Sequence, residues 1–111
     1  NSGFTTRDFG RIRDAVLTSN PKAQMAVDGY HGFCAIPTDL SALEAEVFYL
    51  AGGYKYAQAG EGICFMVCPD RAEGLRPSHT GWFSDFQRLA QVHTDAPGTY
   101  GSDGARFRGA T

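Results

Sequence analysis

Hydrophobic residues recur at helical spacing near the start of the chain. Thr5-Thr6-Arg7-Asp8 has the S/T-x-x-acid form of a helix start, which places Asp8 in the first turn. One face of the following helix would carry the apolar residues Phe9, Ile12, Val16 and Leu17. Thr18-Ser19-Asn20-Pro21 ends the helix, because the residue before a proline is pushed out of the helical region. We predict an amphipathic surface helix here.

Three short apolar runs follow and predict strands at residues 23–27 (AQMAV), 47–51 (VFYLA) and 63–68 (ICFMVC). The first two are separated by a long connection with a short helix at 41–46, which favours a parallel pair. The third follows a short turn at 58–62, which favours an antiparallel hairpin. Further short helices are expected at 70–75 and 85–92. The predicted fold class is α/β, with a mostly parallel sheet, an antiparallel hairpin and flanking helices.

Length and composition restrict the function classes. The chain has 111 residues, enough for one modest domain, and a formal net charge of -2, which gives no basic footprint for nucleic acid or an anionic membrane. No apolar run approaches the roughly 20 residues of a membrane helix. Three cysteines without CxxC spacing favour a reducing compartment, and we expect a cytoplasmic protein.

Two further expectations concern the cysteines and the chain ends. Cys64 and Cys68 are expected in the core, too far apart on an extended strand to share one metal, so no metal site is predicted. The chain starts at Asn1 rather than at a methionine and stops at Thr111 without a helix stop or polar tail. We therefore expect residues 1–111 to be an internal piece of a larger protein.

Candidate chemistry lies where the predicted strands end. Asp28 and His31 follow the first strand, and Lys55, one of two lysines in the chain, follows the second strand and two glycines. Ligands bind at the carboxyl ends of strands in parallel α/β sheets, so these side chains are expected to face one cleft. The alternatives are structural: Asp28 caps a turn, and Lys55 is a surface lysine paired with Glu61.

A carboxylate and an amine in one cleft have a specific joint use. A lysine can hold pyridoxal phosphate as a Schiff base, while a carboxylate keeps the pyridine nitrogen protonated. Two other kinds of site are excluded. The phosphate-loop pattern GxxxxGK[ST] is absent around Lys55, and the adjacent Ser78 and His79 have no acid to complete a triad.

The chain resembles the class V aminotransferase family of fold-type I pyridoxal-phosphate enzymes, which includes kynureninases and cysteine desulfurases. The resemblance covers nearly the whole chain. Its motifs, in order, are Asp28-x-x-His31, Tyr54-Lys55-Tyr56, Gly60-x-Gly62, the kynureninase-like Thr80-Gly81-Trp82-Phe83 and the run Arg106-Phe107-Arg108-Gly109-Ala110-Thr111.

The resemblance implies a role for each matched residue. Lys55 would form the Schiff base and move the Cα proton of the substrate. Asp28 would bind the pyridine nitrogen, and His31 would approach the phenolic oxygen of the ring. Tyr54 would hydrogen-bond the phosphate. Trp82 and Thr111 would reach the phosphate region of the neighbouring subunit's site, since such enzymes build their sites across a dimer interface; for Trp82 the alternative is a buried loop anchor.

The resemblance also implies an architecture and a reaction class. Residues 1–111 would be part of the cofactor-binding large domain, without its N-terminal phosphate-loop region and without the C-terminal small domain. The protein would be a homodimer acting on an amino acid or amine by transamination or by lyase chemistry. The alternatives are a kynureninase-like or cysteine-desulfurase-like lyase, and a family member that has lost catalysis and serves as a binding protein.

Overall fold

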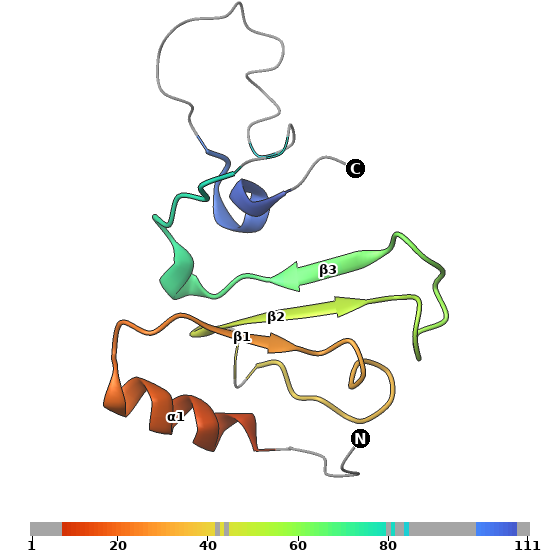
Figure 1. Cartoon of the computed structure of the whole chain (residues 1–111), viewed down its shortest axis with the longest axis horizontal. Coiled ribbons are helices and arrows are strands. Elements are labelled where there is room, and N and C mark those ends of the chain that lie inside the picture. The colour runs from red at the N-terminus through yellow and green to blue at the C-terminus, as the bar shows by residue number, and fades with distance from the viewer. Residues whose placement is uncertain are drawn as a thin grey trace, which may run out of the picture. The chain divides into compact units, whose positions relative to one another are not determined.

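The computed structural model describes residues 8–41, 43, 45–79, 81, 84 and 100–108. The chain divides into two compact units, Asn1–Arg71 and Ala72–Thr111. In the first unit the described elements are one helix and a three-stranded sheet (Figure 1). The described elements that follow are two short 3-10 helices, η1 (Asp70–Ala72) and η3 (Asp103–Phe107).

The helix α1 spans Phe9–Ser19 and confirms the predicted amphipathic helix. Asp8 lies just before the first turn rather than in it, and its carboxylate accepts a hydrogen bond from the Arg11 backbone N–H at 3.0 Å. This contact satisfies a donor that the helix itself leaves unpaired. Asn20 closes the other end in an extended conformation, as Pro21 requires of the residue before it.

The sheet consists of β1 (Met25–Asp28), β2 (Val47–Gly52) and β3 (Cys64–Val67) in the order β1-β2-β3. β1 and β2 are parallel, whereas β2 and β3 are antiparallel. Each pairing agrees with the prediction made for its connection, but the described sheet is mixed rather than mostly parallel. Figure 1 shows α1 beside β1, on the side away from β2, and an ion pair between Arg13 and Glu46 at 3.2 Å links the helix to the residue before β2.

Alternation along the strands gives the sheet two different faces. The core face is defined by Val27, Val47, Tyr49, Ala51, Phe65 and Val67. Val47, Tyr49 and Ala51 are buried there. From the connection between β1 and β2, Gly29 lies against the Tyr49 ring, and the Phe33 ring contacts the Phe65 ring at a centroid distance of 5.0 Å. The open face is defined by Ala26, Asp28, Phe48, Leu50, Gly52, Cys64 and Met66. Of these seven residues only Gly52 is buried.

The three short helices predicted at 41–46, 70–75 and 85–92 differ from the structure or lie outside the described residues. The described residues of segment 41–46 form turns rather than a short helix, with Leu43 buried as the anchor of the connection. The helix expected at 70–75 is the single turn η1, after which Gly74 adopts a positive φ of 83°. The helix expected at 85–92 lies outside the described residues.

In the second unit, described residues contact one another through short loops. The Arg76 guanidinium lies over the Tyr100 ring, 4.9 Å from its centroid, and the Tyr100 hydroxyl donates to the Pro77 carbonyl at 3.4 Å. The Gly101 N–H donates to the carbonyl of the buried Ser84 at 2.8 Å. This unit contributes no described strand.

Candidate functional site

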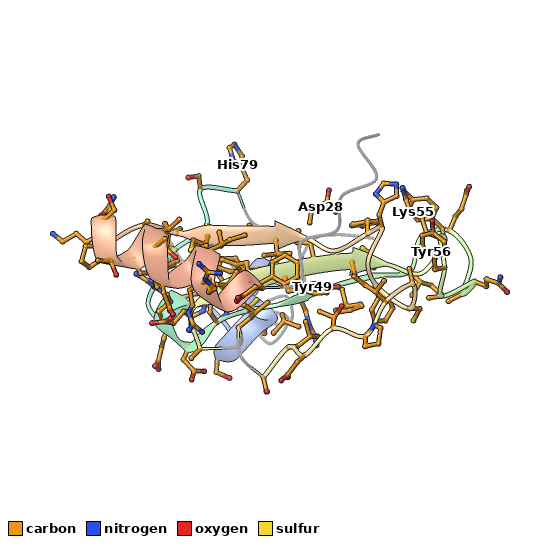
Figure 2. All side chains as sticks on the ribbon, turned by 90° about the horizontal axis from the view of Figure 1, so that it is seen from below. Asp28, Tyr49, Lys55, Tyr56 and His79 are labelled. Atoms are coloured by element: carbon orange, nitrogen blue, oxygen red, sulfur yellow. The ribbon has the colours of Figure 1, made fainter. Side chains whose placement is uncertain are left out.

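The carboxyl ends of β1 and β2 lie at the same edge of the sheet because the two strands are parallel. Asp28 ends β1 opposite Leu50, and the chain leaves β2 two residues later, at Gly52, before it reaches Lys55. Figure 2 shows Asp28 and Lys55 on one side of the sheet and Tyr49 on the other. The structure therefore brings the predicted carboxylate and amine to one end and one face of the sheet.

Lys55 and His31 are in direct contact. The Lys55 Nζ lies 2.6 Å from the His31 Nε2, although 24 residues separate the two in sequence. His31 is exposed and Lys55 is half-buried. Which of the two nitrogens donates depends on the tautomer of the imidazole. The contact links the loop that follows β1 to the loop that follows β2.

A glycine-rich turn places Lys55. Gly53 donates its N–H to the Ile63 carbonyl at 2.7 Å and accepts from the Ala59 N–H at 2.8 Å. A side chain at Gly53 would contact the Ala59 Cβ at 2.8 Å, which real structures do not allow. The Lys55 backbone carbonyl accepts a hydrogen bond from the Gln58 N–H at 3.2 Å, and Gln58 has a positive φ of 53° in this turn. Backbone hydrogen bonds therefore hold the segment that carries the amine.

Asp28 is exposed, and its carboxylate accepts a hydrogen bond from the Tyr30 backbone N–H at 3.0 Å. This is the turn-capping role that the sequence left open as an alternative. A carboxylate has several acceptor positions, so one backbone contact still allows it to bind a protonated ring nitrogen. The other structural alternative is not observed: within the described residues Lys55 forms no ion pair with Glu61.

Tyr54 is half exposed, with a relative accessibility of 51%, and its ring lies beside the amine, 5.3 Å from the Lys55 Nζ. The ring is also in contact with the Tyr30 ring, at a centroid distance of 5.8 Å and an interplanar angle of 51°. The phosphate contact predicted for Tyr54 stays a prediction, and the exposure of this residue is compatible with it.

Tyr30 is a site residue that the sequence analysis missed. Its ring lies directly on Gly52 of the open face, in the space that a Cβ would take there. Burial raises the pKa of Tyr30 above its ordinary value of 10.0, and the Cys64 thiol adds to this shift, with smaller contributions from Tyr54 and Asp28. The signal in the sequence was its position between Asp28 and His31, two residues already singled out.

The remaining predicted residues are placed as follows. Trp82 and Thr111 lie outside the described residues, so their predicted phosphate contacts stay predictions. Cys64 is exposed and Cys68 half-buried, so the expectation that both lie in the core is wrong: Cys64 opens β3 on the open face. Among the described residues no group of histidine, cysteine and acidic side chains is arranged to hold a metal ion.

The described residues offer side chains for three parts of pyridoxal phosphate. Lys55 would present an amine to the aldehyde and Asp28 would present a carboxylate to the pyridine nitrogen, from neighbouring strand ends on one side of the sheet. Tyr54 is the described candidate for the phosphate. The chemistry of these donors fits the cofactor.

No family model, curated protein or solved structure matches this chain. None of the helices in the described ranges has the length and apolar character needed to cross a membrane.

Proposed function

We propose that this chain is part of the large domain of a pyridoxal-phosphate-dependent enzyme acting on an amino acid or a related amine. One observation carries the proposal. An amine that contacts an imidazole and a carboxylate from the neighbouring parallel strand lie at the same end and on the same side of the sheet. The resemblance to class V aminotransferases assigns these same residues to the cofactor.

In this proposal Lys55 holds the cofactor through its Nζ and later accepts and returns the proton of the substrate Cα. Asp28 binds the pyridine nitrogen and, as a carboxylate, favours its protonated form. His31 contacts the amine at 2.6 Å and approaches the phenolic oxygen of the ring, and Tyr54 binds the phosphate. When bound, the cofactor supplies an electron-accepting ring that stabilises negative charge at the substrate Cα. Transamination and lyase chemistry share these residues, so the proposal covers both.

A visible-light spectrum of the purified protein with pyridoxal phosphate, followed by borohydride reduction and peptide mass spectrometry, tests the proposal. We expect a yellow protein in which reduction fixes the cofactor covalently to the peptide containing Lys55. Lys55→Ala should lose both signals, whereas Lys22→Ala should keep both. Asp28→Asn should keep the covalent attachment but bind the cofactor more weakly, because the amide cannot balance a protonated nitrogen.

The second candidate is a protein of the same fold that has lost catalysis and serves as a binding protein. Retention of both the amine and the carboxylate argues against it, since a binding role requires neither. A colourless protein in the presence of excess cofactor, with no mass added to the Lys55 peptide, would favour this second candidate and end the enzyme proposal.

A further inference from the structure

Tyr30 contacts two of the residues that the proposed function assigns to the cofactor. Its backbone N–H donates to the Asp28 carboxylate at 3.0 Å, and its ring contacts the Tyr54 ring at a centroid distance of 5.8 Å. Asp28 is the residue proposed for the pyridine nitrogen, and Tyr54 is the residue proposed for the phosphate. Tyr30 therefore links two ends of the proposed cofactor site, although the proposed function gives it no role of its own.

Gly52 makes room for the Tyr30 ring. The ring occupies the space that a side chain at Gly52 would take, so a larger residue at this position would displace it. Gly52 is the buried last residue of β2, and Tyr54 lies in the loop that follows. The Tyr30 ring thus lies on the end of β2, and the Tyr54 ring, which is 51% exposed, contacts it there.

We propose that Tyr30 is a positioning residue, which holds the Tyr54 ring so that the Tyr54 hydroxyl binds the phosphate of the cofactor. The inference rests on the proposed function, because it takes pyridoxal phosphate as the ligand. A half-exposed tyrosine loses side-chain freedom when it binds a ligand, and a neighbouring ring that restricts it beforehand lowers this cost. Tyr30 acts through Tyr54 and is assigned no contact with the phosphate.

The proposal predicts an effect on one part of the cofactor. Pyridoxal lacks the phosphate but keeps the aldehyde and the pyridine nitrogen, so it is the matched control ligand. Tyr30→Ala removes the ring but keeps the backbone N–H that donates to Asp28, so it should weaken the binding of pyridoxal phosphate and leave that of pyridoxal unchanged. A general loss of structure would weaken both. The ratio of the two dissociation constants therefore separates positioning from a merely structural role.

The test is titration of the protein with each compound, followed by the absorbance of the Schiff base. The chains compared are the unaltered protein, Tyr30→Ala, Tyr54→Phe and the double variant. We expect Tyr30→Ala to reduce the preference for the phosphorylated compound by about two- to tenfold, the factor that corresponds to one lost aromatic contact. Tyr54→Phe should reduce it by at least as much, because it removes the hydroxyl itself. In the double variant Tyr30→Ala should add nothing, since the phosphate contact is already absent.

Two further variants keep the test decisive if Tyr30→Ala perturbs the fold. Tyr30→Phe keeps the ring and should therefore keep the phosphate preference. Gly52→Ala keeps the tyrosine but displaces its ring, so it should lower the preference as Tyr30→Ala does. Circular dichroism shows whether each variant is folded. Loss of the preference in Tyr30→Phe would overturn the proposal, because the hydroxyl rather than the ring would then be the part that matters.

A measurement without cofactor tests the placement of Tyr54 directly. Tyr54 and Tyr56 are 51% and 58% exposed, so Tyr56 serves as the reference tyrosine in the same loop. Nitration by tetranitromethane, located by peptide mass spectrometry, should increase at Tyr54 relative to Tyr56 in Tyr30→Ala but not in Tyr30→Phe. An unchanged ratio in Tyr30→Ala would show that Tyr30 does not hold the Tyr54 ring, and the proposal would fall.

The binding results distinguish this inference from the proposed function. If the unaltered protein binds no pyridoxal phosphate, the proposed function fails and the role of Tyr30 fails with it. If the protein binds pyridoxal phosphate but Tyr30→Ala weakens both ligands alike, only the role of Tyr30 is overturned. The same holds if Tyr30→Ala has an equal effect with and without Tyr54→Phe.

Discussion

The two faces of the sheet use the same strands for different purposes. On the core face Val47, Tyr49 and Ala51 are at most 2% exposed, and the connection from β1 to β2 packs over them. On the open face the residues that alternate with these are half-buried or exposed, apart from Gly52, and they include Asp28 and Cys64. Residues adjacent in sequence therefore experience different surroundings.

This contrast between the two faces predicts which substitutions should affect stability and which should affect chemistry. A buried apolar side chain stabilises the fold through the surface that it removes from water. A polar side chain at the open strand ends, such as Asp28, contributes little to that burial but stays accessible to a ligand. Substitutions on the core face should therefore unfold the chain before they alter the site, and substitutions on the open face should do the reverse.

The largest expected effect is that of Tyr49→Ala. The Tyr49 ring is 2% exposed and contacts the Phe65 ring at a centroid distance of 6.3 Å. Removing it should lower the free energy of unfolding by about 3–5 kcal/mol, the usual range for a buried aromatic residue. The matched control is Leu50→Ala, the next residue on the open face, for which we expect about 1 kcal/mol because it is half-buried. Urea unfolding followed by circular dichroism measures both, and equal losses would contradict the assignment of the faces.

The sequence predicted most of this sheet. All three apolar runs became strands, and connection length correctly distinguished the parallel pair from the hairpin. The connection before β2 was misread as a helix: segment 41–46 has helical composition, but its described residues form turns around the buried Leu43. Composition reports local preference, and in so short a segment tertiary packing overrides it.

A second, smaller effect compares two glycines that each lie under a tyrosine ring. A Cβ at Gly29 would overlap the ring of Tyr49, whereas one at Gly52 would overlap the ring of Tyr30. Tyr49 is fully packed and cannot retreat, so Gly29→Ala should cost about 1–3 kcal/mol of stability. Tyr30 is half-buried on the open face and can rotate away, so Gly52→Ala should cost less than Gly29→Ala.

At the site around Lys55 the order should be reversed, with Gly52→Ala having the larger effect. Displacement of Tyr30 removes its contact with Tyr54, the ring beside Lys55, so Gly52→Ala should change the labelling of Lys55 by pyridoxal phosphate and borohydride. Gly29→Ala, at a urea concentration where it remains folded, should leave that labelling unchanged. Thermal unfolding measures the stability, and borohydride reduction followed by peptide mass spectrometry measures the labelling. A larger loss of stability in Gly52→Ala than in Gly29→Ala would reverse the comparison.

The site was predictable only in part. Asp28, His31 and Lys55 could be singled out because parallel strands bring their carboxyl ends together, a rule that sequence order alone can apply. The contact between His31 and Lys55 could not be predicted, because it depends on how two loops of different length curl beyond the strand ends. Tyr30 was missed for a similar reason: its role comes from its contact with Gly52, which is 22 residues away in sequence and lies under the Tyr30 ring.

The smallest effect concerns the ionisation of the two tyrosines that mark the faces. Burial raises the pKa of Tyr49 on the core face and of Tyr30 on the open face above 10.0, and a hydrogen bond with Thr38 partly opposes the shift at Tyr49. The Cys64 thiol contributes only at Tyr30. Cys64→Ala should therefore lower the pKa of Tyr30 and leave that of Tyr49 unchanged. Ultraviolet absorbance titration measures both values, assigned by the difference from Tyr30→Phe and Tyr49→Phe.

The sign of the pH dependence follows from these shifts. A tyrosine whose pKa is higher in the folded chain than in the unfolded chain contributes stability that is fully present below about pH 10, the unfolded value, and is lost as the pH rises through the folded value. Phenylalanine cannot ionise. As the pH rises from neutral to alkaline, the free energy of unfolding of Tyr49→Phe should therefore fall by less than that of the unaltered chain. Tyr30→Phe should show the same trend more weakly, because its ring can turn toward water when it ionises. The opposite result is also informative. If Tyr30→Phe protects the chain against alkaline unfolding more than Tyr49→Phe does, then Tyr30 on the open face is shielded from water more firmly than Tyr49 on the core face.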